Sequence, residues 1–354
     1  MLVHEYCSDL EPGAVGAHAL VVRDLLQQAG HRCEIVTPRL DPAYAASGAH
    51  LLGEVRGTPD LLLYQMGIGA EVADVLLART EPLVVNYHNL TPSRLLAGWD
   101  PVAAHGVVWG RQQLRALAPR SESGIAVSRY NEAELVEAGF AHTAVVPFLL
   151  DLAAFGAEPD AALLERLRAT RAGTEWLFVG RVAPHKAQHD LLKAFASYRR
   201  FHDADARLHL VGGGLDSAYG RALTNFASSL GLGDSVVLTG AVAGGALAAY
   251  YANADVFTVA SEHEGFCVPL LESWYHRVPV VAYAAAAIPE TLGDGGLLLD
   301  AKDPYTFAAA VARVVPGGPV RETLVANGSA RLAQFDLAVT GPAFVETLTG
   351  VTAR

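Results

Sequence analysis

Seven residues separate Glu264 from Glu272 in the stretch SEHEGFCVPLLES, residues 261–273, which also carries apolar side chains that favour burial. Pro269 suits the first turn of a helix, because its missing N–H is not needed there, and Glu272 then falls in that turn. Two carboxylates around one concave corner can accept hydrogen bonds from the vicinal hydroxyls of a sugar. The structural alternative makes Glu264 a loop charge and Glu272 a favourable charge at a helix start.

The backbone between these two acids offers a second kind of contact. The N–H groups of residues 267–271, except at Pro269, lie near the expected helix start, where backbone donors favour an anion. Since a nucleotide sugar presents hydroxyls and phosphates together, the stretch predicts a site for the sugar and nucleotide of such a ligand. The residues assigned to this site are Gly212, Gly265, Phe266, Cys267, Val268, Leu270 and Glu272.

Two cations follow one predicted strand in the second half of the chain. Arg181 comes directly after the sequence WLFVG, and Lys186 comes five residues later, before a helix. An arginine fork and a lysine point charge together suit a diphosphate. The alternative is that both are solvated surface charges, the usual state of these residues, but their place at a strand end favours diphosphate binding.

The first half of the chain carries weaker signals. Gly13 and Gly16 lie in the first strand–helix connection and His18 follows on the helix, so these residues predict an acceptor or anion contact, with a tight turn as the alternative. His88 and Asn89 end a strand, and Asn89 is assigned to the acceptor side together with Gly13, Gly16 and His18. A lone histidine is more often structural than catalytic, yet a position at the carboxyl end of a strand makes His88 a catalytic candidate.

Metal-binding patterns are weak. Asp203 and Asp205 have the D-x-D spacing of some metal–diphosphate sites, but they precede a predicted strand and lie at its amino end, so we expect solvated loop charges. The cysteines, Cys7, Cys33 and Cys267, are scattered and odd in number, which indicates neither a disulfide framework nor a metal site. We therefore expect no metal ion and no cofactor other than a nucleotide-sugar co-substrate.

Parallel sheets are needed to position these residues. Strand-like and helix-like segments alternate along the chain, which is typical of parallel sheets covered by helices, and ligands bind beyond the carboxyl ends of such strands. Regularity is lost near residues 150–160, so the expected fold is α/β, with two Rossmann-like parallel-sheet domains facing a central cleft. A helix is expected at 161–169, and expected strands include 32–38, 60–67, 82–89, 143–148, 175–181, 207–214, 235–242, 254–261 and 278–283.

Composition excludes several classes of protein. A chain of 354 residues suggests about two domains. The net charge of −11, without a basic stripe, argues against nucleic-acid binding. No apolar run reaches the roughly 18 residues that a membrane span requires, and the first residues lack a secretory signal. We expect a cytoplasmic protein, with peripheral contact at the inner membrane face left open.

Taken together, these motifs resemble the retaining glycosyltransferases of family 4, which have the GT-B architecture. The stretch EGFCVPLLE resembles that family's E-x7-E signature, GRVAPHK resembles its arginine–lysine diphosphate element, and GAVGAHALVVRDLLQQAGH resembles its N-terminal glycine-rich turn and first helix. The resemblance is far more specific in the C-terminal half. The sequence departs from the family pattern at Cys267 and Ala187, where glycine is commoner, and in having Gly-Ala-Val-Gly in place of a double glycine.

The resemblance implies a hexosyltransferase-type enzyme that moves a sugar from a nucleotide sugar to an acceptor hydroxyl, with retention of anomeric configuration and without a metal. It implies that Arg181 and Lys186 hold the donor diphosphate and that Glu272 binds the ribose. It also implies that Glu264 and His88, the two catalytic assignments, lie beside the donor sugar. The expected donor is a UDP- or GDP-sugar, and the expected acceptor is a sugar, a lipid or a small molecule, as in glycan, glycolipid or glycosylated-metabolite biosynthesis.

The resemblance further implies a domain plan. Residues 1–153 would form an acceptor-binding domain, 154–333 a donor-binding domain, and 334–354 a C-terminal helical segment that crosses back onto the first domain. Two rival functions stay open: a nucleotide-sugar epimerase or hydrolase of the same architecture, and a non-catalytic partner that binds nucleotide or glycan. The presence of all four charged donor positions argues against the non-catalytic alternative.

Overall fold

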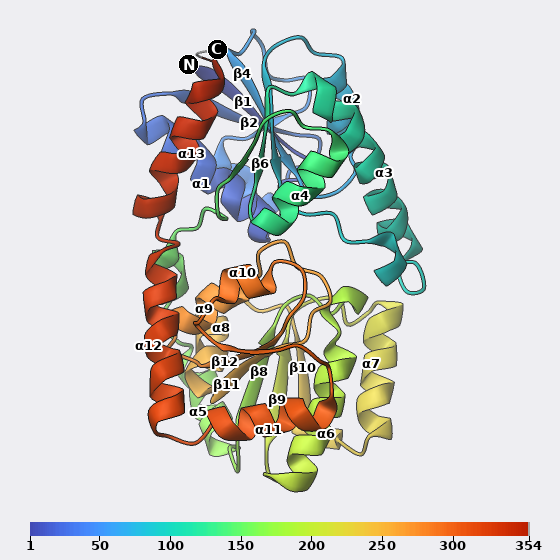
Figure 1. Cartoon of the computed structure of the whole chain (residues 1–354), viewed down its shortest axis with the longest axis vertical. Helices are drawn as coiled ribbons and strands as arrows, with labels where there is room; N and C mark the ends of the chain where they lie inside the picture. Colours follow the sequence, from blue (N-terminus) through green and yellow to red (C-terminus); the bar gives the residue numbers. More distant parts are fainter. Residues whose placement is uncertain (353–354) are drawn as a thin grey trace. The chain divides into compact units, whose positions relative to one another are not determined.

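The computed structural model describes residues 1–352 and divides into two compact units (Figure 1). The first unit contains Met1–Arg94, Pro101–Asp151 and the described residues from Gln334 onward, and the second contains Leu95–Asp100 and Leu152–Ala333. The short segment Leu95–Asp100 thus departs from a plan with a single boundary near residue 153. Its Trp99 packs edge-on against Tyr219 of the second unit, with ring centroids 5.4 Å apart.

The first unit is built on a parallel seven-stranded sheet in the order β3-β2-β1-β4-β5-β6-β7. The central strands β4 and β5 are buried along their whole length, as expected for parallel strands covered on both faces. The strands are β1 (Leu2–Cys7), β2 (Arg32–Thr37), β3 (His50–Leu51), β4 (Leu61–Met66), β5 (Leu83–Tyr87), β6 (Ser123–Ala126) and β7 (Thr143–Val145).

Helices cover both faces of this sheet, with α1 and α13 on one face and α2, α3 and α4 on the other (Figure 1). Phe344 and Leu348 of α13 pack into the same buried core as Val22 and Leu26 of α1, so the last helix belongs to the first unit. The helices are α1 (Ala14–Gln28), α2 (Glu71–Leu77), α3 (Pro101–Leu117), α4 (Arg129–Ala138) and α13 (Leu337–Thr352).

The second unit is built on a parallel six-stranded sheet in the order β10-β9-β8-β11-β12-β13. The two predicted parallel-sheet domains are therefore confirmed. The strands are β8 (Glu175–Val179), β9 (Arg207–Val211), β10 (Val236–Gly240), β11 (Val256–Val259), β12 (Val280–Tyr283) and β13 (Leu297–Leu299). The helices are α5 (Ala161–Ala169), α6 (Gln188–Phe201), α7 (Ala218–Ser229), α8 (Gly244–Asn253), α9 (Pro269–Tyr275), α10 (Ile288–Leu292), α11 (Pro304–Val314) and α12 (Pro319–Ala333).

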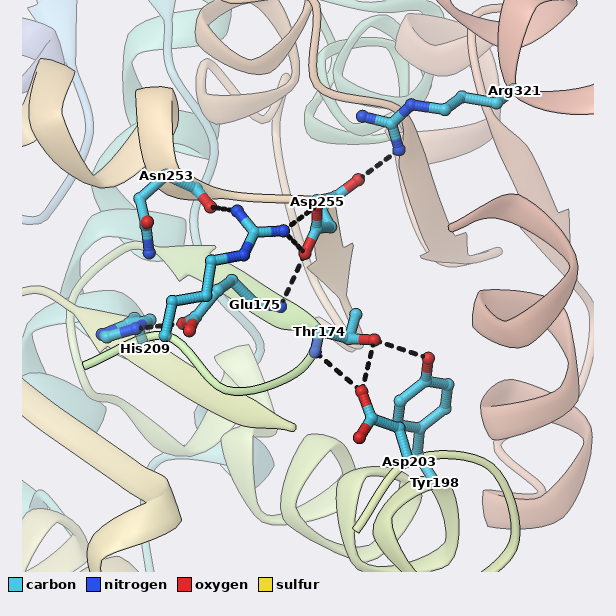
Figure 2. A network of polar contacts seen from close by, with 9 residues as sticks. Thr174, Glu175, Tyr198, Asp203, His209, Asn253, Asp255 and Arg321 are labelled. Atoms are coloured by element: carbon cyan, nitrogen blue, oxygen red, sulfur yellow. Dashed lines mark hydrogen bonds and ion pairs between the residues drawn. The ribbon is translucent and has the colours of Figure 1, made fainter. Parts of the chain in front are cut away.

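A polar network holds the amino ends of the strands in the second unit (Figure 2). The N–H and hydroxyl of Thr174 both donate to one carboxylate oxygen of Asp203 at 2.7 Å, and the same hydroxyl lies 3.0 Å from the Tyr198 hydroxyl. Partial burial acts to raise the pKa of Asp203, but these bonds outweigh it and leave that pKa lowered. Asp203 is therefore a loop charge, as predicted, although it anchors Thr174 rather than being simply solvated.

Asp255 ties the same end of the sheet together. Its carboxylate accepts from the backbone N–H of Glu175 at 2.9 Å and from the guanidinium of Arg171 at 2.6 Å (Figure 2). The buried side chains of Glu175 and His209 meet at 2.7 Å. Structural polar contacts thus gather at the amino ends of these strands, which leaves the carboxyl ends for a ligand. No helix in the described residues is both long enough and apolar enough to cross a membrane.

Candidate functional site

The predicted donor residues lie in loops that follow strands β8 and β11. Residues 260–268 join β11 to helix α9, which begins at Pro269 and carries Glu272 in its first turn, as predicted. Leu270 and Leu271 are fully buried, while the acid Glu264 is only 8% exposed. The apolar residues of this stretch therefore anchor the loop and helix in the core and hold the two carboxylates at the sheet edge.

Lys186 and Glu264 form an ion pair within this edge. Lys186 ends the 3₁₀ turn Pro184–Lys186 after β8, and its ammonium donates to both carboxylate oxygens of Glu264 at 2.7 Å. The sequence assigned these residues to different parts of a ligand, the diphosphate and the sugar. Their contact shows that the two assigned positions are adjacent, so one nucleotide sugar could meet both.

The two departures from glycine in this region both have left-handed backbone. Ala187 has φ of 50° and Cys267 has φ of 73°, and both residues are buried. A β-carbon in this conformation costs about 1–2 kcal/mol, which explains why glycine suits both positions. Ala187 and Cys267 thus keep the left-handed backbone conformation that glycine favours, although each has a side chain.

One backbone prediction for the loop is wrong. The N–H groups of Leu270 and Leu271 were expected to face an anion, but they donate to the carbonyls of Cys267 and Val268 at 3.0 and 2.9 Å. The turn that leads into α9 closes its own hydrogen bonds, which the spacing of proline and glutamate did not indicate. The backbone donors of Leu270 and Leu271 are therefore not available to an anion.

Glu272 is held by a residue that sequence reasoning missed. The hydroxyl of Tyr251 on α8 donates to Glu272 Oε2 at 2.7 Å, and the Tyr251 ring stacks on His276 with centroids 4.9 Å apart. Burial raises the pKa of the Glu272 carboxyl, and the tyrosine bond opposes that shift. A tyrosine within an apolar helix carries no motif, so only the fold places it beside this carboxylate.

Arg181 differs from Lys186 in being exposed. Within residues 1–352 its guanidinium makes no hydrogen bond or ion pair. A cavity of about 90 Å³ lies beside it, smaller than the roughly 300 Å³ at which ligand pockets begin, so it would hold only part of a ligand. Its lining consists of Leu96, Trp99, Asp100, Arg181, Val182, Ala183, Pro184, Gly214, Ser217 and Tyr219.

The fold requires glycine at some positions of the predicted site but not at others. A β-carbon at Gly212 would lie 2.0 Å from the Gly180 carbonyl oxygen, so the packing of the ends of β8 and β9 already requires glycine there. In the first unit a β-carbon at Gly16 would lie 2.3 Å from the Glu11 carbonyl oxygen, whereas one at Gly13 would meet no atom within 4 Å. Of these three positions, Gly13 is therefore the one whose glycine the fold does not explain.

His88 and Asn89 follow strand β5, as predicted, and His88 joins a polar network in the first unit. Its Nε2 lies 2.6 Å from the side-chain amide of Gln65. The side-chain amide of Asn86 lies 2.9 Å from the side-chain amide of Gln65 and 2.9 Å from His18 Nε2. The backbone N–H of Leu149 donates to His18 Nδ1 at 3.2 Å. Both ring nitrogens of buried His18 are thus occupied inside the unit, so His18 supports His88 rather than offering a free nitrogen to a ligand.

Both histidines are uncharged at neutral pH. Burial lowers the pKa of His18 to about 3, and burial together with the neighbouring His18 lowers the pKa of His88 well below its ordinary value. Their ring centroids are 4.7 Å apart. The side chain of Asn89 points elsewhere, because its carbonyl oxygen accepts from Asn131 at 3.0 Å. A neutral His88 can exchange hydrogen bonds with a hydroxyl but does not supply positive charge.

The site residues thus fall into two groups, one in each unit. Arg181, Lys186, Gly212 and the residues from Glu264 to Glu272 lie at the carboxyl ends of the second sheet. Gly13, Gly16, His18, His88 and Asn89 lie at the carboxyl ends of β1 and β5 or on the helix that follows β1. Among the residues that the structure describes, no three histidine, cysteine, aspartate or glutamate side chains gather in a way that could hold a metal ion.

Comparison with known proteins gives the family. Residues 173–316 match the family model described as Glycosyl transferases group 1. A D-inositol 3-phosphate glycosyltransferase of Kineococcus radiotolerans is 33% identical over 284 residues, which cover 75% of this chain and 65% of the relative. A GDP-mannose-dependent alpha-(1-6)-phosphatidylinositol monomannoside mannosyltransferase of Mycobacterium tuberculosis is 30% identical over 296 residues, covering 77% of this chain and 74% of the relative.

The chain belongs to the family of group 1 glycosyl transferases. It spans between 55% and 65% of the length of the inositol-phosphate relatives that it matches. Solved structures agree on the fold. HepE from Anabaena, solved with UDP and glucose, has a TM-score of 0.77 at 18% identity, over 99% of this chain and 100% of HepE. Sucrose-phosphate synthase from Thermosynechococcus elongatus has a TM-score of 0.78 at 19% identity, over 100% of this chain and 99% of the synthase. This likeness supports the GT-B fold that the sequence predicted.

Proposed function

We propose that this chain transfers a sugar from a nucleotide sugar to an acceptor hydroxyl. The observation that supports the proposal is the contact between Lys186, the cation that we assign to the diphosphate, and Glu264, the carboxylate that we assign to the sugar hydroxyls. Arg181 and Glu272 lie in the same two loops, after β8 and β11. The membership of the chain in a glycosyl transferase family supports this assignment.

The chemistry of donor binding follows from these charges. Arg181 is unpaired within the described residues and would meet the diphosphate as a fork, while Lys186 would turn from Glu264 toward the phosphate oxygens. Glu264 would then accept hydrogen bonds from the sugar hydroxyls. Two cations at the diphosphate stabilise the negative charge that develops on the leaving phosphate, which is the main catalytic requirement of this reaction.

Glu272 is assigned to the ribose. Tyr251 occupies its Oε2, which leaves Oε1 as the acceptor for a ribose hydroxyl. Tyr251 on α8 and the position of Glu272 within α9 both hold the carboxyl in place. Its Oε1 is therefore pre-oriented to accept the hydrogen bond from the ribose. This assignment makes the nucleoside part of the donor, rather than the sugar, the partner of Glu272.

We assign retention of anomeric configuration and a role for His88 beside the transferred sugar. Glu264 orients hydroxyls in this proposal and does not attack carbon, and the first unit offers no convincing nucleophile. Retention would then result from front-face substitution steered by the departing diphosphate. No metal ion is assigned, because Arg181 and Lys186 supply the positive charge, and loss of activity in EDTA that Mn²⁺ or Mg²⁺ restores would contradict this.

The relatives suggest which substrates to test. Their names include D-inositol 3-phosphate and GDP-mannose, and HepE was solved with UDP and glucose. We therefore propose a UDP- or GDP-sugar donor and a sugar, an inositol phosphate, a lipid headgroup or another small molecule as acceptor, at a cytoplasmic site. Lipid acceptors would require peripheral contact with a membrane surface.

One assay separates this proposal from its rivals. The protein is incubated with UDP-glucose or GDP-mannose, with and without D-inositol 3-phosphate and other hydroxyl acceptors, and free nucleotide is measured. A transferase releases nucleoside diphosphate in step with acceptor. A hydrolase releases it equally without acceptor, an epimerase alters the sugar, and a non-catalytic binding protein does neither.

A further inference from the structure

A buried chain of polar side chains crosses three neighbouring strands of the first sheet and reaches His88. Glu5 on β1 lies 2.6 Å from the side-chain amide of Gln65 on β4, and Gln65 contacts both Asn86 and His88. Glu5 and Gln65 have no solvent exposure and Asn86 has 1%. The buried carboxyl of Glu5, which reaches His88 through Gln65, has no assigned role in the proposed reaction.

The direction of each hydrogen bond in this polar network follows from the one donor whose identity is fixed, a backbone N–H group. The backbone N–H of Leu149 is always a donor, so His18 Nδ1 must accept and the proton of neutral His18 must lie on Nε2. That proton needs an acceptor, and the group 2.9 Å away is the Asn86 amide. If the amide nitrogen of Asn86 faced His18, both ring nitrogens would face N–H donors, which a neutral imidazole cannot accommodate.

The nitrogen and oxygen of an amide are told apart by their partners, so Asn86 must direct its oxygen toward His18. That oxygen lies 2.9 Å from one end of the Gln65 amide, which must then be the nitrogen. The same nitrogen lies 2.6 Å from His88 Nε2, so His88 Nε2 accepts a hydrogen bond. The proton of neutral His88 therefore lies on Nδ1, which has no partner within residues 1–352.

The other end of Gln65 is then its oxygen, facing Glu5 at 2.6 Å. Two oxygens at this distance form a hydrogen bond only if one of them carries a proton. Glu5 must therefore be a neutral carboxylic acid that donates to Gln65. Its second oxygen lies 3.5 Å from the Cys33 thiol, a weak donor, so this assignment leaves both Glu5 oxygens partnered.

We propose that Glu5 is a positioning residue whose carboxylic proton orients the Gln65 amide and so fixes His88 as the tautomer with its proton on Nδ1. The tautomer follows from the hydrogen-bond network alone. Its consequence for turnover rests on the proposed function, in which His88 acts beside the transferred sugar.

The electrostatic surroundings of Glu5 agree with a neutral acid. Burial raises the pKa of Glu5 to about 8, and the weak contact with the Cys33 thiol acts to lower it. Among more distant charges, Arg23 lowers this pKa and Asp24 raises it. The other titratable neighbours are His18 and His88, both neutral, and the buried thiol of Cys7, whose own pKa is raised by burial.

The direct test is NMR of the wild-type protein with ¹⁵N-labelled histidine. Long-range proton–nitrogen correlations distinguish protonated from unprotonated ring nitrogens, and the His88→Ala variant identifies which signals belong to His88. We expect Nε2 of His88 to be unprotonated and Nε2 of His18 to be protonated at neutral pH. A proton on Nε2 of His88, or an ionised Glu5 carboxylate in the carbon spectrum at pH about 7, would overturn the proposal.

Two variants of matched size test the role of the acid. Glu5→Leu removes the donor, so Gln65 can adopt both orientations, and the His88 signals should shift toward a mixture of tautomers. Glu5→Gln keeps an N–H donor for Gln65 and should restore the wild-type pattern. In turnover, Glu5→Leu should lower kcat about tenfold, the equivalent of one hydrogen bond, with unchanged affinity for the nucleoside diphosphate, and Glu5→Gln should recover most of it.

The outcomes separate this inference from the proposed function. The predicted tautomer combined with an unchanged kcat in Glu5→Leu would support the network and contradict the role of His88. An unchanged His88 spectrum in a folded Glu5→Leu protein would overturn the positioning role of Glu5. If that variant does not fold, the wild-type spectrum recorded from about pH 7 to above pH 9 decides, because ionisation of Glu5 must perturb the His88 nitrogens.

Discussion

The ammonium of Lys186 contacts both carboxylate oxygens of Glu264 at 2.7 Å, so a cation and an anion assigned to different parts of the donor neutralise each other when no donor is bound. Glu264 is 9% exposed at its side chain and Lys186 is 21% exposed. We therefore propose that donor binding is an exchange of partners, in which the diphosphate would compete with Glu264 for Lys186 and the sugar hydroxyls would compensate Glu264. This relationship makes opposite predictions for the two residues.

Lys186→Ala should weaken binding of the free nucleoside diphosphate about tenfold to a hundredfold, since a charge-assisted hydrogen bond contributes about 1.5–3 kcal/mol. Glu264→Gln should bind the same diphosphate at least as tightly as wild type, because a competing anion is removed, while its turnover with the sugar donor falls. Calorimetry and steady-state kinetics measure the two effects. Equal losses of diphosphate affinity in both variants would contradict the exchange.

A double variant controls for stability. Lys186→Ala leaves the carboxylate of Glu264 largely buried and unpaired, which should cost about 1–3 kcal/mol of unfolding free energy. Lys186→Met combined with Glu264→Gln removes both charges and should recover most of that stability without recovering diphosphate affinity. Recovery of affinity along with stability would show that Lys186 acts only through the fold.

Glu272 and Tyr251 form the second testable pair. Glu272→Gln should impair binding of the free nucleoside diphosphate, because the amide replaces one acceptor oxygen by a donor. Tyr251→Phe removes only the hydrogen bond that orients the carboxylate, so its effect on the same affinity should be smaller. Titration calorimetry of both variants is the measurement. If Glu272→Gln binds as well as wild type does, Glu272 serves only as a charge at the helix start.

The first glycine-rich turn supplies a matched pair of substitutions. Gly16→Ala should destabilise the protein by about 1–3 kcal/mol, because its β-carbon would meet the Glu11 carbonyl oxygen at 2.3 Å. Gly13→Ala has open space and should leave the unfolding free energy nearly unchanged. A loss of activity in the stable Gly13→Ala protein would indicate that a ligand approaches this backbone, whereas wild-type activity would leave Gly13 as an ordinary turn residue.

Much of the architecture could be predicted from local patterns, and its limits have physical causes. Each expected strand range contains or overlaps an observed strand, because buried parallel strands are continuous apolar runs. The edge strands His50–Leu51 and Leu297–Leu299 were not predicted, since two or three residues carry no periodicity. Strand β8 ends at Val179 rather than at 181, because Gly180 turns the chain where it meets Gly212.

The site was only partly predictable. Motif spacing placed Lys186, Glu264 and Glu272 at strand ends and at a helix start, because these positions depend on local structure. Their partners depend on tertiary contacts: Tyr251 is 21 residues from Glu272, and Gln65 is 60 residues from Glu5. Residues in apolar strands and helices without a motif give no sequence signal for such roles.

The carboxyl of Glu5 makes stability depend on pH. Burial raises its pKa from 4.5 to about 8, so the native state holds this proton over a range in which the unfolded state loses it. The stability of the wild type should therefore fall by about 1.4 kcal/mol per pH unit from this group alone as pH rises from about 4.5 to about 8. Glu5→Gln lacks that term.

Urea unfolding of both proteins at several pH values within this range measures the difference. The unfolding free energy of Glu5→Gln relative to wild type should increase steadily with pH and level off above about pH 8. A difference that does not change with pH would mean that Glu5 is already ionised in the native protein, contrary to its proposed role as a donor to Gln65.

The central claim is that a sugar passes from a nucleotide sugar to an acceptor with its anomeric configuration retained. The most direct measurement is NMR of the fresh product formed from a donor labelled with ¹³C at the anomeric carbon, with D-inositol 3-phosphate among the acceptors offered. The account predicts that the label appears in a glycosidic bond to the acceptor, in the anomeric configuration of the donor. Labelled sugar released free into solution, or linked with the inverted configuration, would contradict it.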